Sequence, residues 1–148
     1  FKHTLAGLSV GGIISASSLA GDFVMPKDTR KKLAFIAGGI GVTPFASMAR
    51  HCIASEENRD AILLYASKKE DEAAYRGVFD SASRNGWRAI YRIGAIDAEF
   101  IKSEVPDYSE RIFYISGPPG FVTAMKNILL SLGVSRFSIK TDFFPGLA

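Results

Sequence analysis

The sequence predicts an α/β fold, namely a Rossmann-like parallel sheet of five strands with helices on both faces. Two stretches point to it, each a short apolar run that ends in glycines and opens into a helix-like pattern. The first is Leu33–Ala37, followed by Gly38-Gly39-Ile40-Gly41-Val42-Thr43-Pro44; the second is Ile112–Ser116, followed by Gly117-Pro118-Pro119-Gly120. Apolar runs also alternate with helical periods along the chain, which is typical of a parallel sheet covered on both sides.

Size, charge and cysteine content limit the function classes. At 148 residues, with 47% hydrophobic and 22% charged residues, the chain has the composition of one globular domain. The net charge of +3 comes without clusters of Lys and Arg among aromatics, so we expect no nucleic-acid partner. No stretch is apolar enough for a membrane span. The single Cys52 excludes an internal disulfide and fits a reducing compartment, so we expect a cytoplasmic protein.

The chain divides at a polar, linker-like stretch, residues 26–30, into a short head and a longer body. We set the boundary after residue 28, which gives the regions 1–28 and 29–148. The head has one expected strand, around Ile13–Ser17, and too few large side chains for a core of its own.

In the body, the hydrophobic period switches repeatedly between strand and helix. After the strand Leu33–Ala37, we expect a helix from Pro44 to about Ala54, a strand over Ala61–Ala66 and a helix from about Asp71 to Arg84. The apolar face of the first helix is formed by Phe45, Met48, Ala49, Cys52 and Ile53.

The second half of the body continues the alternation. A strand is expected over Trp87–Ile93, and Asp97 is a good N-cap for a short helix through Ile101. After Ile112–Ser116 comes a helix that Gly133 closes as a C′ glycine, and Phe137–Lys140 is the last expected strand. The helix before Gly133 buries Phe121, Val122, Met125, Ile128, Leu129 and Leu132.

The first glycine turn has the features of a phosphate site. Gly39 and Gly41 match the first two glycines of the dinucleotide fingerprint, but Pro44 stands where the third would be. Thr43 can cap the helix through its hydroxyl, and Pro44 suits the first helical position, where no amide partner is needed. A tight strand-to-helix turn without any ligand is the alternative interpretation.

The end of the second strand departs from the NAD fingerprint. An acidic residue would normally bind the ribose 2′-hydroxyl there, yet the chain reads Ser67-Lys68-Lys69 before the first carboxylate at Glu70. These residues could receive a 2′-phosphate, or they could form a solvated loop. His3 and His51 lack neighbouring cysteines or carboxylates at ligand spacing, so no metal site is expected.

The motif Gly-Gly-Ile-Gly-Val-Thr-Pro, followed by Ser-Gly-Pro-Pro-Gly and an aromatic C-terminus, resembles the nucleotide domain of the ferredoxin–NADP⁺ reductase superfamily. In that family a flavin-binding β-barrel precedes the domain, and residues 1–28 resemble the tail of this barrel. The resemblance implies an NAD(P)H-dependent flavin oxidoreductase that transfers hydride between NAD(P)H and flavin. Electrons would then be exchanged with a redox partner such as ferredoxin, or another iron–sulfur or haem protein.

The resemblance also implies roles for particular residues. Those expected to bind cofactor are Gly38, Gly39, Gly41, Thr43 and Pro44 at the pyrophosphate, Ser67, Lys68 and Lys69 at the adenosine ribose, and Gly117, Pro118 and Pro119 at the nicotinamide half. Ser116 stands where the family usually has a cysteine near the hydride, and Asp142 matches a carboxylate of the same polar network. Phe144 matches the aromatic that covers the flavin.

The family's flavin-binding motif, an Arg followed by a Tyr and a Ser or Thr, is missing with the early barrel strands. We therefore expect FAD in the full-length enzyme but not in this chain alone. Either the chain is a piece of a longer protein, which the absent initiator Met favours, or a partner supplies the flavin. The alternative functional class is a non-catalytic nucleotide-binding or regulatory module. A response-regulator-like or flavodoxin-like domain is more distant, because neither requires the second glycine turn.

Overall fold

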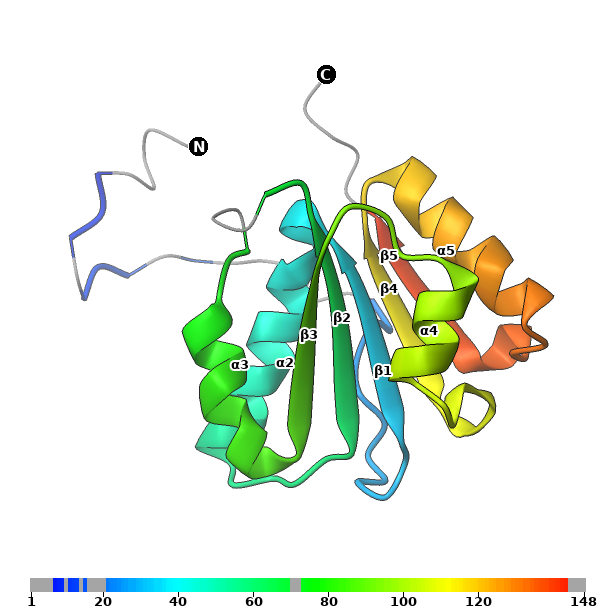
Figure 1. Cartoon of the computed structure of the whole chain (residues 1–148). Helices are drawn as coiled ribbons and strands as arrows, with labels where there is room; N and C mark the ends of the chain where they lie inside the picture. The colour runs from blue at the N-terminus through cyan, green and yellow to red at the C-terminus, as the bar shows by residue number, and fades with distance from the viewer. Residues whose placement is uncertain (1–6, 10, 14, 16–20, 70–72, 144–148) are drawn as a thin grey trace.

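Five parallel strands form one sheet in the computed structural model, which describes residues 7–9, 11–13, 15, 21–69 and 73–143 (Figure 1). Their order across the sheet is β3-β2-β1-β4-β5, and every pairing between neighbours is parallel. The strands are β1 (Leu33–Gly38), β2 (Ala61–Ser67), β3 (Trp87–Ile93), β4 (Ile112–Gly117) and β5 (Ile139–Phe143). The five-stranded Rossmann-like sheet is confirmed.

Helices cover both faces of this sheet, with α2 and α3 on one side and α4 and α5 on the other (Figure 1). The α-helices are α2 (Thr43–Ala54), α3 (Arg76–Ala82), α4 (Ala98–Glu104) and α5 (Pro119–Ser131). Short 3₁₀ turns are η1 (Gly39–Val42), η3 (Ser83–Asn85), η4 (Tyr108–Glu110) and η5 (Arg136–Ser138). We call the two sides the α2 face and the α5 face.

The central strand β1 is buried at every position, because its side chains alternate between two separate apolar clusters. On the α2 face, the Phe35 ring stacks on Trp87 with 4.7 Å between centroids and lies 5.0 Å from Phe45. Burial of each such side chain contributes roughly 2 kcal/mol. The continuous apolar runs of the sequence correspond to this two-sided burial.

Capping chemistry predicted some helix ends correctly. The Asp97 carboxylate accepts a hydrogen bond from the Phe100 amide at 2.8 Å, which confirms the N-cap, although α4 continues past Ile101 to Glu104. After α5, Gly133 has a φ of +84° and occupies the expected C′ position.

Three expected elements differ from the structure. The helix expected from Asp71 begins only at Arg76, because Tyr75 has a left-handed backbone with a φ of 63°. The last strand covers Ile139–Phe143, since the Ser135 side chain caps η5 in the preceding residues. Within the expected head strand, Ile13 and Ser15 are not in a strand, and its other residues lie outside the described part of the chain.

An arginine fastens the amino-terminal edge of the sheet. Arg111, whose side chain is 5% exposed, donates to the Leu33 carbonyl at 3.0 Å and to the Asp60 carboxylate at 2.7 Å. It also pairs with Asp107 through Nε at 2.7 Å and Nη2 at 3.0 Å. The Arg111 hydrogen bond lowers the pKa of Asp107 to about 2, with help from Lys32. This network ties together the starts of β1, β2 and β4.

Candidate functional site

A cavity of about 610 Å³ lies at the carboxyl edge of the sheet. This is the edge at which open parallel sheets bind ligands. The cavity is bordered by the residues that end β1 and β2, those that follow β3 and β4, and the first turns of α5. Its lining residues are Gly38, Gly39, Ala66, Ser67, Lys68, Gly94, Ala95, Ile96, Pro118, Phe121, Ala124 and Met125.

The first two glycines of the turn allow it to border this cavity. A Cβ at Gly38 would lie 2.8 Å from the Phe121 ring, so only glycine lets β1 pack so closely on α5. Gly39 has a φ of +53°, and a Cβ there would meet nothing within 4 Å. Its backbone is therefore open to the cavity in a conformation that glycine adopts at little cost.

Gly41 has a different surrounding. A Cβ on Gly41 would lie 2.2 Å from the Ser116 carbonyl oxygen and 2.5 Å from the Gly117 amide nitrogen. The residue is buried against β4 and is not among those that line the cavity. Glycine is needed here for contact between the two turns.

The expectation that Thr43 caps α2 is wrong. The Thr43 hydroxyl instead donates to the Ile40 carbonyl at 2.7 Å. The N-cap position is taken by Val42, whose αR backbone leads η1 directly into the helix, so the extended residue that a side-chain cap requires is missing. Pro44 lies in the first turn of α2 as expected, but it borders a second cavity.

Of the three residues Ser67, Lys68 and Lys69 at the end of β2, the cavity includes two. Ser67 and Lys68 line it, and the Ser67 hydroxyl donates to the Lys69 carbonyl at 2.8 Å. Lys68 is the one charged side chain among the described residues of the lining, whereas Lys69 is not part of that lining. The cavity is thus mostly apolar, with a single cation at the rim beside the end of β2.

The second glycine turn contributes less than expected. Only Pro118 borders the cavity, while Gly117 ends β4 and Pro119 begins α5. The cavity also has an apolar wall, formed by Ile96, Phe121 and Met125, which the sequence does not predict. The helical period predicts Phe121 and Met125 as core residues, and both do contact the apolar cluster of the α5 face. The same pattern cannot show that a core residue at the start of a helix also borders a cavity.

Ser116 and Asp142 lie side by side as register partners of β4 and β5. Ser116 is fully buried, and its Oγ has no hydrogen-bond partner among the described residues. Partners in parallel register point to the same face, so the sheet brings these two polar side chains to the α2 face. Phe144 lies outside the described residues.

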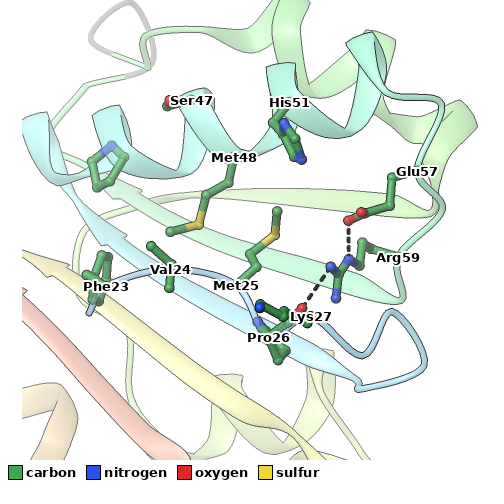
Figure 2. Close-up of a pocket in the computed structure, with 11 residues that line it drawn as sticks. Phe23, Val24, Met25, Pro26, Lys27, Ser47, Met48, His51, Glu57 and Arg59 are labelled. Carbon is green, nitrogen blue, oxygen red and sulfur yellow. Dashed lines mark hydrogen bonds and ion pairs between the residues drawn. The ribbon is translucent and has the colours of Figure 1, made fainter. Parts of the chain in front are cut away.

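A second cavity, of about 690 Å³, lies on the α2 face between α2 and residues 23–27 (Figure 2). Met25, Met48 and His51 border it, together with the side chain of Arg59. In the described ranges there is no cluster of His, Cys, Asp or Glu that could hold a metal ion. Nor does any described helix have the length and apolarity to cross a bilayer.

Known proteins that are similar to this chain include nucleotide-binding oxidoreductases. The oxidoreductase NAD-binding domain family matches residues 35–127. A flavohemoprotein of Bacillus subtilis is 29% identical over 155 residues, covering 93% of this chain and 39% of that protein. The chain thus spans about two fifths of the length of the curated relatives it matches.

Solved structures share the fold. The flavohem-like FAD/NAD-binding domain of nitric oxide dioxygenase from Vibrio cholerae is 26% identical, with a TM-score of 0.66 over 84% of this chain and 55% of that one. The ferredoxin–NADP⁺ reductase of Plasmodium falciparum, at 17% identity, has a TM-score of 0.66 over 84% of this chain and 57% of the other. The chain shares its fold with ferredoxin–NADP⁺ reductase, and it belongs to the oxidoreductase NAD-binding domain family.

Proposed function

We propose that this chain binds NAD(P)H in the cavity at the carboxyl edge and serves a flavin-dependent oxidoreductase. The observation that carries the proposal is the cavity itself, where the open backbone of Gly39 and the cation of Lys68 border one apolar hollow. A dinucleotide offers matching chemistry, because its pyrophosphate needs close backbone approach and its rings need apolar walls.

Within this cavity the parts of the nucleotide would lie beside the ends of different strands. Gly38 and Gly39 would meet the pyrophosphate, and Ser67 and Lys68 the adenosine ribose, with a slight preference for the 2′-phosphate of NADPH. Pro118 would border the nicotinamide half. Gly41, Thr43 and Pro44 support the turn from behind, while Lys69, Gly117 and Pro119 remain proposed neighbours of the ligand.

The reaction we propose is hydride transfer between NAD(P)H and a flavin. Flavin, when bound, would supply the acceptor for the hydride, and names such as flavohemoprotein and FAD/NAD-binding domain among the relatives support its presence in the whole protein. A flavin-binding barrel, upstream or in trans, and an iron–sulfur or haem partner complete the proposal. The cytoplasmic location remains a prediction.

Ser116 and Asp142 are the proposed catalytic residues. Their pairing across β4 and β5 supports a common polar site, in which the Asp142 carboxylate would stabilise positive charge that develops on the nicotinamide ring. The Ser116 hydroxyl, which has no partner among the described residues, would donate to its register neighbour Asp142.

The test is calorimetric titration of the chain with NADH and NADPH, using two blocking variants. Ala124→Phe fills the carboxyl-edge cavity, and Ser47→Phe fills the second cavity from a helix position that is also exposed. We expect Ala124→Phe to weaken binding at least ten-fold and Ser47→Phe to leave it unchanged. The reverse pattern, or no binding to the parent chain, would overturn the proposal.

A further inference from the structure

A short stretch that precedes the sheet, residues 22–28, is attached to the α2 face, and we call it the strap. Phe23 and Met25 pack against the apolar cluster of this face. The Phe23 ring lies 5.3 Å from Tyr114 and 6.0 Å from Phe45, measured between ring centroids. Val24, between the two inward residues, is 60% exposed. Alternate residues therefore face the domain and the solvent, as along an edge strand.

The main chain of the strap is held by side chains instead of by a neighbouring strand. The Tyr114 hydroxyl donates to the Val24 carbonyl at 2.8 Å. Arg59 donates to the Pro26 carbonyl through Nη2 at 2.9 Å and to the Asp28 carbonyl through Nη1 at 3.1 Å. Lys140 on β5 also donates to the Asp22 carbonyl at 3.4 Å and to the Val24 carbonyl at 3.5 Å. Four carbonyls spaced two residues apart are thus bound, from β4, from β5 and from the loop before β2.

Arg59 is a costly residue to place here, because its side chain is only 3% exposed and a buried guanidinium must have its charge compensated. Glu57 supplies that compensation by accepting from Nε at 2.5 Å. Nη2 points at the Pro26 carbonyl of the strap (Figure 2), and Nη1 at that of Asp28. The planar fork of arginine can bind two carbonyls at fixed spacing, which a lysine ammonium on its flexible stem cannot do in the same geometry.

We propose that the strap is a fixed part of the nucleotide-binding domain and that Arg59 and Tyr114 are positioning residues that hold it. The polar stretch at residues 26–30 would then not act as a hinge between this domain and a flavin-bearing part. If the proposed function holds, on which this inference rests, Arg59 sets the angle at which the flavin-bearing part meets the nicotinamide site. Such an angle affects hydride transfer steeply, since a displacement near 1 Å can cost about a hundred-fold in rate.

Limited trypsin digestion of the folded chain tests the strap directly, with cleavage after Lys27 followed by mass spectrometry. We expect Arg59→Met and Arg59→Lys to be cut there at least ten-fold faster than the parent, and Tyr114→Phe to show a smaller increase. Arg111→Met is the matched control, because Arg111 is equally buried but binds Leu33, Asp60 and Asp107 instead of the strap. Urea denaturation of each variant supplies the loss of global stability for comparison.

Two digestion outcomes would overturn the proposal that Arg59 holds the strap on the domain. One is parent-like cleavage in folded Arg59→Lys; the other is cleavage in Arg111→Met that equals Arg59→Met at the same loss of stability. In the flavin-loaded protein, stopped-flow reduction should slow about ten-fold in Arg59→Lys while nucleotide affinity stays within two-fold, and an unchanged rate would refute the positioning role. Failure of the parent chain to bind NAD(P)H would refute the proposed function instead, and the digestion result would still decide the strap.

Discussion

Gly39 and Gly41 lie two residues apart in the first turn but have different surroundings, which predicts different costs for the same substitution. Gly39→Ala should lose about 1 kcal/mol, because an L residue at a φ of +53° is strained although the space is open. Gly41→Ala should lose about 2 kcal/mol or more, since its Cβ would collide with the Ser116 carbonyl. Urea denaturation measures both, and equal losses would show that the turn is not packed on β4 as described.

Lys68 and Lys69 form a similar matched pair for nucleotide preference. Lys68 lines the cavity and Lys69 does not, so Lys68→Ala should weaken NADPH by about 1 kcal/mol, or roughly five-fold, and NADH much less. Lys69→Ala should leave both affinities near those of the parent. Calorimetry with both nucleotides decides this, and an equal loss for NADH and NADPH in Lys68→Ala would mean that no 2′-phosphate lies beside it.

Ser116 carries a buried hydroxyl without a partner among the described residues. We therefore expect this hydroxyl to contribute little to the free energy of unfolding. Removing an unsatisfied buried polar group is neutral or favourable. We expect Ser116→Ala to keep the parent's free energy of unfolding, or to raise it slightly, while slowing hydride transfer in the flavin-loaded protein. Parent-like transfer rates together with a loss of stability would make Ser116 a packing residue only.

At the scale of elements, the junction of η4 and β4 predicts a dependence of stability on pH. The pKa of Asp107 is lowered from 3.8 to about 2 in the fold by its hydrogen bond to Arg111. A lowered pKa contributes stability that is present above pH 4 and is lost as the pH falls toward 2. For a side chain that is 27% exposed, this contribution is about 2 kcal/mol.

The variant that isolates this contribution is Asp107→Asn. The difference in free energy of unfolding between parent and variant should be about 2 kcal/mol at pH 6 and should shrink steadily between pH 4 and pH 2. Chemical denaturation across this range provides the measurement. A difference that stays constant down to pH 2 would show that the carboxylate is not held as an ion pair.

Elements with strong periodicity were predictable, and those decided by a single backbone conformation were not. The buried strands β1, β2 and β4 follow from their apolar composition alone. The start of α4 is predicted by Asp97, whose side chain can cap a helix. The late start of α3 depends on a left-handed Tyr75, which no propensity rule anticipates. The shift of β5 likewise depends on the Ser135 side chain, which stabilises a local turn in place of the first strand residues.

The candidate site was predictable only in part, for a similar reason. Glycine turns mark the carboxyl edge, so Gly38, Gly39, Ser67, Lys68 and Pro118 could be placed at one cavity from the sequence. Gly41 and Thr43 instead support the turn, because their roles depend on contacts with β4 and Ile40 that are not encoded in the motif. The hydrogen bonds from Arg59 to the carbonyls of residues 26 and 28 join segments more than thirty positions apart. No local pattern in the sequence predicts them.

At the scale of the whole molecule, two of the cavities among the described residues lie on opposite sides of the first glycine turn, one bordered by Gly38 and Gly39 and the other by Pro44. The central claim is that the nucleotide occupies the first. The two cavities have similar volumes, and helices cover both faces of the sheet. Size alone therefore does not show which cavity binds the nucleotide. The separation comes from the glycine backbone and Lys68, which only the carboxyl-edge cavity includes.

The most direct test is titration of the ¹⁵N-labelled chain with NADPH, followed by amide chemical shifts. Binding at the carboxyl edge predicts saturable shifts at Gly38, Gly39, Ser67 and Gly94, with the amides of Ser47 and His51 in the second cavity unchanged. Shifts confined to Ser47 and His51, or no saturable shift at any site, would contradict the account.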